Sequence, residues 1–265
     1  MSSNNIRLVD SHCHLNMLDL APYDGKLSGV IAAAAKVDVN AMLCVSVDLP
    51  TLPAVLQTAE QFNNVYASVG IHPNDSKDDP VTVAQLVQLA QHPKVIAIGE
   101  TGLDYYRSEG DLEWQREAFR THIRAAKELQ KPLIIHTRSA QHDTIKIMRE
   151  EGVQAIGGVM HCFTEDWETA QQAIELGFYI SISGIVTFKN AVQIQNVAKQ
   201  IPLVCMLVET DSPYLAPIPH RGKSNYPAYT RIVAEYIAQL RNESLATIAE
   251  HTTQNFYNLF KGANA

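Results

Sequence analysis

Residues 6–14 of the chain are Ile-Arg-Leu-Val-Asp-Ser-His-Cys-His. The apolar part, Ile6–Val9, is typical of a short strand, and two histidines follow where this strand is expected to end. Residues two apart on a strand point to the same side, so His12 and His14 should emerge together. Such a pair is a compact beginning for a metal site, and a chance pair of histidines on an exposed edge is the alternative at this point.

Short apolar runs rich in β-branched residues recur along the rest of the chain. They are Ala41–Val47, Val65–Val69, Val95–Ile98, Leu133–Ile135, Ala155–Met160, Phe178–Ile182 and Val204–Val208. Segments with helical spacing lie between them, at Val83–Ala90, Glu113–Leu129, Asp143–Glu151, Asp166–Leu176 and Ala191–Lys199. Eight strands that alternate with helices over this length favour a (β/α)8 barrel. A doubly wound open sheet is the alternative, because periodicity alone does not reveal closure.

Length and composition predict a single α/β domain over residues 1–265. Hydrophobic residues make up 46% of the chain and charged residues 18%, which is enough for a substantial core and too apolar for disorder. The tail from Tyr226 to Phe260 is expected to form two helices, with Ser244 as the N-cap of the second.

The sequence carries no signal for a membrane or for export. No apolar run approaches membrane-spanning length, and residues 1–5 lack the basic-then-apolar form of a signal peptide. Four cysteines without disulfide-like spacing predict reduced thiols and a cytoplasmic location. Cys13 and Cys162 adjoin candidate ligand histidines, but a strand neighbour points away from its flanking residues, so neither is expected to be a nucleophile.

The net charge of −7 bears on possible partners. A protein that binds duplex nucleic acid over a broad surface usually carries a basic patch, and an acidic chain argues against that mode. The charge still permits an enzyme that admits a strand end into a small, locally cationic pocket.

Residue types that bind metals stand where the predicted strands end, which is where a barrel of this kind carries its chemistry. They are His12, His14, His72, Glu100, His136, His161, Glu209 and Asp211. Any one histidine could satisfy a local hydrogen bond, but that explanation weakens when five strands contribute together. Histidine and carboxylate ligands suit Zn²⁺, Mn²⁺ or Mg²⁺, and one acidic bridge between two histidine groups suits a two-metal centre.

Several segments resemble those of the TatD-type metal-dependent deoxyribonucleases, most closely the bacterial YcfH-like branch. They include DSHCHL at 10–15, VGIHP at 69–73, IGETGLDYY at 98–106, KPLIIHTR at 131–138, HCF at 161–163 and VETDSPYLAP at 208–217. The resemblance runs from Asp10 to Phe260, which is nearly the whole chain. It implies a (β/α)8 barrel of the amidohydrolase superfamily.

The resemblance also implies roles for single residues. One divalent ion would be held by His12, His14 and Asp211, the second by His136 and His161, and Glu100 would bridge both. Glu209 and His72 match further active-site positions of the family, Glu209 as a catalytic residue and His72 in substrate binding. Independently, Asp211 is the candidate general base, and three loop cations are expected to hold phosphates, with solvated surface charge as the alternative: Arg107, Arg138 and Arg221.

Three positions depart from the family pattern. Asn74 stands where a second histidine is common, Glu165 where glycine is usual, and Tyr226 where an Asn-Glu-Pro segment commonly has glutamate. None of them is among the six expected metal ligands, so they bear on the substrate pocket.

The sequence therefore predicts a deoxyribonuclease with two divalent metal ions, which activate water to attack the phosphodiester bonds of single-stranded DNA from an end. A metal-dependent amide or ester hydrolase, such as an aminoacyl-tRNA deacylase, is one alternative. A non-catalytic metal-binding protein is another. The expected partners are DNA or nucleotide ends, with no membrane and no obligate protein partner.

Overall fold

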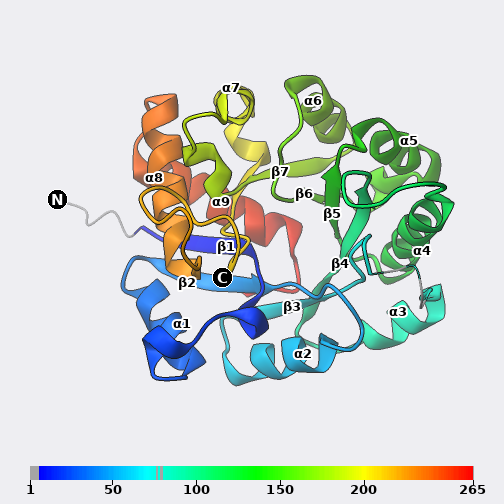
Figure 1. Ribbon diagram of the computed structural model, residues 1–265, viewed down its shortest axis with the longest axis horizontal. Coiled ribbons are helices and arrows are strands. Elements are labelled where there is room, and N and C mark those ends of the chain that lie inside the picture. Colours follow the sequence, from blue (N-terminus) through cyan, green and yellow to red (C-terminus); the bar gives the residue numbers. More distant parts are fainter. Residues whose placement is uncertain (1–5, 76, 78–79, 265) are drawn as a thin grey trace.

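Eight parallel strands form one sheet in which each strand pairs with the next along the chain (Figure 1). The computed structural model describes residues 6–75, 77 and 80–264, so the expectation about a signal peptide in residues 1–5 lies outside the described residues. The strands are β1 (Leu8–Cys13), β2 (Val39–Cys44), β3 (Val65–Val69), β4 (Val95–Asp104), β5 (Leu133–Arg138), β6 (Gly158–Met160), β7 (Phe178–Ile182) and β8 (Met206–Val208).

The segment that follows β8 closes the sheet against β1. The amide of Asp211 donates to the carbonyl oxygen of His12 (2.9 Å), and the amide of His14 donates to that of Ser212 (2.8 Å). The hydroxyl of Ser11 adds a hydrogen bond to the carbonyl oxygen of Val208 (3.0 Å). The predicted (β/α)8 barrel is therefore confirmed, and the open doubly wound sheet is wrong. Closure also brings His12 and His14 beside Asp211.

Helices surround the strands (Figure 1). They are α1 (Leu27–Ala35), α2 (Leu52–Gln61), α3 (Val83–Leu89), α4 (Glu113–Leu129), α5 (Gln141–Glu151), α6 (Trp167–Glu175), α7 (Val192–Gln200), α8 (Thr230–Arg241) and α9 (Leu245–Leu259). The buried residues of α4 recur every three or four positions, as one helix face against the sheet requires: Gln115, Phe119, His122, Ile123, Ala125 and Ala126. Among the described residues, no helix is both long enough and apolar enough to span a bilayer.

The helix predictions agree with the structure to within two residues at each end, from α3 to α7. The tail forms the two expected helices, and the Ser244 hydroxyl accepts from the Thr247 amide (3.0 Å) as the N-cap of α9. Helices α1 and α2 are not among the segments that the sequence assigned.

Three strands continue past the C-terminal ends of their apolar runs. The first run ends at Val9, but β1 continues to Cys13, and the fourth run ends at Ile98, but β4 continues to Asp104. The fifth run ends at Ile135, but β5 continues to Arg138. Backbone pairing defines a strand, and it continues here through polar residues whose side chains serve the site. The reverse error occurs where Val153–Ala155 and Leu203–Cys205 form 3-10 turns before β6 and β8. His12, Glu100 and His136 therefore lie within strands, not after them.

A hydrophobic cluster fills the end of the barrel where the strands begin. It joins residues of seven strands to two aromatic rings of the C-terminal segment: Val9, Ala41, Tyr66, Ile96, Ile134, Val159 and Leu207 with Phe256 and Phe260. Helix α9, which carries Phe256, packs against β1 and β8 (Figure 1). Because this cluster fills one end of the barrel, polar side chains can gather at the opposite end, where the strands finish.

Candidate metal centre

The expected metal ligands converge at the end of the barrel where the strands finish. They come from β1 and its end, from β4, from β5 and from the residues after β6 and β8: His12, His14, Glu100, His136, His161 and Asp211. His12 has no exposed surface, and the most exposed side chain of the six, that of His136, is 18% exposed. The structure thus brings together all six residues that the sequence singled out.

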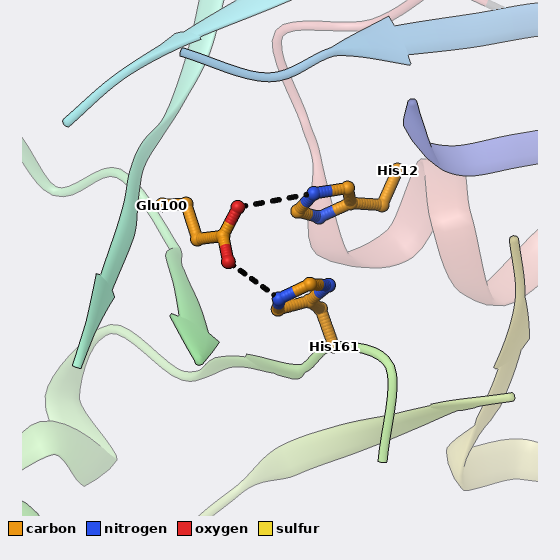
Figure 2. Close-up of side chains that lie close together, drawn as sticks. All are labelled: His12, Glu100 and His161. Atoms are coloured by element: carbon orange, nitrogen blue, oxygen red, sulfur yellow. Dashed lines mark hydrogen bonds and ion pairs between the residues drawn. The ribbon is translucent and has the colours of Figure 1, made fainter. Parts of the chain in front are cut away.

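The Glu100 carboxylate directs one oxygen toward His12 and the other toward His161 (Figure 2). Its Oε2 is 3.3 Å from His12 Nε2, and its Oε1 is 2.8 Å from His161 Nε2 and 3.0 Å from His136 Nδ1. The His12 and His161 rings stack beside it with their centroids 3.8 Å apart. One oxygen toward each group is the arrangement of a carboxylate that bridges two cations.

The first group is formed by His12, His14 and Asp211, together with Glu100 Oε2. The two Nε2 atoms lie 3.4 Å apart, and Asp211 Oδ1 is 3.4 Å from His14 Nε2 and 3.7 Å from His12 Nε2. His14 Nδ1 donates to the carbonyl oxygen of Val45 (3.0 Å), so Nε2 is the ring nitrogen that faces the group and, once deprotonated, can offer its lone pair to a cation. These donor atoms fit one divalent cation.

The second group is formed by His136, His161 and Glu100 Oε1. Glu209 stands behind His161, with Oε1 3.4 Å from His161 Nδ1, and the same oxygen accepts from the Cys162 amide (2.6 Å). Glu209 has no exposed surface. This buried position is better suited to orienting His161 than to contacting a substrate.

The pKa values of the site residues follow from opposed charges in a buried space. Burial lowers the pKa of His161, but the Glu100 carboxylate outweighs it and raises the pKa well above 6.5. Asp211 raises the pKa of His14 against the same effect of burial. Although burial favours its neutral form, Glu100 has its pKa held well below 4.5, first by His161 and then by His72. The lowered pKa means that Glu100 is ionised near neutral pH. The raised pKa values of His14 and His161 mean that these rings keep their protons to a higher pH than a free imidazole, and a bound cation would displace those protons.

A cavity of about 490 Å³ opens beside these groups. Besides five of the six candidate ligands (His14, Glu100, His136, His161 and Asp211), its lining includes His72, Arg107 and Arg138. Arg138 also lies over the exposed Tyr106 ring, 3.9 Å from its centroid. Arg221 lies elsewhere, 4.5 Å from the centroid of Phe188. Two of the three expected phosphate-binding arginines therefore face the cavity.

His72 offers a hydrogen-bond donor to the cavity. Its Nδ1 accepts from the Asn74 amide (3.2 Å), so the ring proton resides on Nε2, which is 3.6 Å from Glu100 Oε1. Burial lowers the pKa of His72 to about 4, so the ring is neutral near pH 7. A neutral Nε2–H group suits an oxygen atom of a bound substrate.

Residues 9–261 match a family described as TatD related DNase. The chain belongs to the TatD family. It is 50% identical over 253 residues to YcfH of Escherichia coli K12, named an uncharacterized metal-dependent hydrolase, with 96% of this chain and 95% of YcfH covered. It is 42% identical over 255 residues to the similarly named YabD of Bacillus subtilis, with 96% and 99% covered. The crystal structure of YjjV, a TatD homologue from Escherichia coli, has a TM-score of 0.89 at 28% identity and covers 97% of this chain and 99% of YjjV.

Family membership makes the protein a metal-dependent hydrolase, and the resemblance stated from the sequence is confirmed. The histidine and carboxylate groups at the strand ends can hold metal ions. These groups are therefore the candidate metal site of this metal-dependent hydrolase.

The departures from the usual TatD pattern differ in how closely they approach the site. Asn74 reaches it, because its Nδ2 donates to Asp104 Oδ2 (3.1 Å). Glu165 is half-buried, and the Tyr226 hydroxyl donates to the carbonyl oxygen of Asp19 (3.0 Å). The sequence analysis assigned no role to Asp104, although this residue lies beside the site. The alternation of side chains along β4 could have revealed it, because Asp104 lies on the same face of the strand as Glu100.

The cysteines beside the TatD histidines are protonated thiols. Cys13 Sγ donates to the carbonyl oxygen of Leu43 (3.4 Å), and Cys162 Sγ lies 3.3 Å from Ser183 Oγ. Burial raises the pKa of both thiols well above 9.0. Thiols in that state are weak nucleophiles near neutral pH.

We expect the apparent affinity for Mn²⁺ to fall as the pH is lowered from about 8 to about 5.5, by about tenfold per pH unit for each proton displaced. The raised pKa values of His14 and His161 mean that these rings still hold protons above 6.5, and a cation binds only the neutral ring. Calorimetric titration in buffers of different ionisation enthalpy measures both the affinity and the protons released. An affinity that is constant over this range would contradict the prediction.

Proposed function

We propose that this TatD protein is a deoxyribonuclease that uses two divalent cations to remove nucleotides from an end of single-stranded DNA. The observation that carries the proposal is the Glu100 carboxylate, with one oxygen toward each histidine group, beside a cavity lined by Arg107 and Arg138. The description of the matching family as TatD related DNase supports the same substrate.

The cavity suits a strand end. A volume of about 490 Å³ is in the range of small-ligand pockets, and guanidinium groups are well matched to phosphates. Tyr106 is 67% exposed and is held by Arg138, so its ring can stack on a base. The net charge of −7 disfavours binding along a duplex. Arg221 would contact phosphates farther from the cleaved bond.

In this mechanism, His12, His14 and Asp211 would hold one cation, His136 and His161 would hold the other, and Glu100 would be shared between the two. When bound, the two cations, as Mg²⁺, Mn²⁺ or Zn²⁺, supply Lewis-acid activation of water and offset negative charge on the phosphoryl oxygens.

The remaining side chains bind and transfer protons. Arg107 and Arg138 hold phosphates, and His72 donates its Nε2–H to a phosphoryl oxygen. Asp211 accepts the proton of the attacking water. Burial opposes its ionised form, but the hydrogen bond from His14 and the nearby His12 lower its pKa, so the base is ready near pH 7. Glu209 orients His161 from behind.

The test is a substrate panel with purified protein. With Mg²⁺ or Mn²⁺, we expect end-labelled single-stranded DNA to be shortened progressively from one end, duplex DNA to be a poorer substrate, and EDTA to stop the reaction. His136→Ala should lower the rate more than about 100-fold because a metal ligand is lost. His142→Ala, which changes a 90% exposed histidine on α5, is the matched control and should leave the rate unchanged. Hydrolysis of aminoacyl-tRNA or esters without cleavage of DNA would overturn the proposal.

A further inference from the structure

A third group of potential ligands adjoins the two already described. It contains His72, Asp104 and His136, whose donor atoms lie within 4.8 Å of one another. Asp104 ends β4, is 1% exposed and has its Oδ2 3.3 Å from His136 Nε2. The group could hold a third cation. Alternatively, Asp104 could orient His136, which is a candidate ligand of the second cation. The protons on the two imidazoles distinguish these possibilities.

His136 cannot give a lone pair from both ring nitrogens while it is neutral. Its Nδ1 faces Glu100 Oε1 at 3.0 Å, which is the side of the second cation. A neutral imidazole has one lone pair and one N–H group, so Nδ1 as a ligand places the proton on Nε2. That atom is buried and has no aligned hydrogen-bond partner in the described part of the chain. A buried N–H group requires an acceptor, and Asp104 Oδ2 stands at 3.3 Å.

His72 likewise has no lone pair to offer a third cation. Its Nδ1 already accepts from the backbone N–H group of Asn74, so its Nε2 carries the proton. Two of the three members of the group therefore present N–H groups toward this space, and N–H groups do not bind metal ions. The arrangement favours Asp104 as an acceptor over Asp104 as a metal ligand.

The carboxylate of Asp104 is held so that one oxygen must face His136. Its Oδ1 accepts from the amides of Tyr106 and Arg107, both at 3.0 Å. Its Oδ2 accepts from Asn74 Nδ2 (3.1 Å). Donors from two loops thus fix both oxygens, and the carboxylate has little freedom to turn.

The backbone beside this contact is also tightly fixed. Gly102, two residues before Asp104, has φ +139°, and a Cβ atom there would lie 2.0 Å from the carbonyl oxygen of His136. Strand β4 therefore approaches β5 closely beside the ring that Asp104 faces, which leaves His136 little room to shift.

We propose that Asp104 is a positioning residue for His136: it accepts a hydrogen bond from Nε2–H and thereby fixes the tautomer that presents Nδ1 to the second cation. The side chain of Asn74, one of the departures from the usual family pattern, donates to the same carboxylate oxygen and helps to hold it in place. The inference rests on the proposed two-cation site, and its test measures metal binding in the absence of DNA. Failure of the nuclease proposal would therefore leave it standing, and the reverse also holds.

The first test is stepwise calorimetric titration of the full chain with Mn²⁺. In Asp104→Asn, the loop amides hold the side-chain oxygen, so the new amide group takes the place of Oδ2 and sets a donor against the donor of His136. We expect the second cation to bind about 10- to 100-fold more weakly, with the first cation unchanged. Asp143→Asn is the matched control, since Asp143 is a carboxylate on neighbouring α5 that accepts from Tyr105 (2.8 Å).

A double-mutant cycle with His136→Ala separates positioning from a general structural role. His136→Ala identifies the binding step that belongs to the second cation, and Asp104→Asn should cause no further loss in that background. Equal weakening of both cations in Asp104→Asn, or an undiminished penalty in the His136→Ala background, would overturn the proposal. So would wild-type protein that binds three ions and Asp104→Asn that binds two, because Asp104 would then be a ligand.

The second test needs no variant of Asp104. Imidazole nitrogen chemical shifts of histidine-labelled, Zn²⁺-loaded wild-type protein report which ring nitrogen carries a proton, and His136→Ala assigns the signal. The proposal requires the Nε2–H form with Nδ1 on the metal. The opposite form at His136 would contradict it.

Discussion

Replacing Glu100 by glutamine is expected to lower the rate of hydrolysis by at least about 1,000-fold and to weaken the binding of both cations. Glu100 contacts the two histidine groups with different oxygens, so a neutral amide removes the charge shared by both sites. The amide also replaces one carboxylate oxygen by an NH2 group, which has no lone pair to offer a cation. Metal content after dialysis and the rate at saturating Mn²⁺ measure the two effects separately.

The matched control for Glu100→Gln is Glu60→Gln. Glu60 also pairs with a histidine, His92 Nε2 at 2.9 Å, but on the surface of the molecule. Exposed pairs of this kind contribute little, so metal content and rate should equal those of the wild type. Loss of one cation alone in Glu100→Gln would show that Glu100 does not bridge.

The barrel and the convergence of the ligands could be predicted because both follow from local patterns. Each apolar run marks a strand, and parallel strands in a closed barrel finish at one end. His12 and Asp211 are 199 positions apart in the chain, yet the prediction that they meet needed only their places after the first and last runs. The hydrogen bond from the Asp211 amide to the His12 carbonyl oxygen is the local form of that closure.

The parts that could not be predicted depend on contacts between distant segments. The extension of β4 to Asp104 follows from pairing with β5, which no apolar pattern in 99–104 reveals. The proton positions on His72 and His136 are set by Asn74 and Asp104, and each of those lies in or beside a different loop. Arg107 and Arg221 look alike in sequence as loop cations, and only the fold shows that Arg107 lines the cavity.

Replacing Asp211 by asparagine is expected to lower kcat by about 1,000-fold with a much smaller change in KM, because the proton acceptor for water is lost. Asparagine is the substitution that isolates this effect. Asp211 has φ +57°, a left-handed conformation that asparagine tolerates and alanine does not. The backbone, including the amide that closes the barrel against His12, is therefore preserved. Rates at increasing Mn²⁺ correct for the weaker binding of the first cation.

Asp38→Asn is the matched control, since Asp38 also has a positive φ, of +67°, but it pairs with Arg231 outside the cavity. Its kcat should equal that of the wild type, which shows that an Asp-to-Asn change in this backbone conformation is harmless. If saturating Mn²⁺ restored the full rate of Asp211→Asn, Asp211 would be a metal ligand without a role in proton transfer. A lower rate that persists at saturating Mn²⁺ would support Asp211 as the general base, because the fold, the cation and the remaining ligands are then all in place.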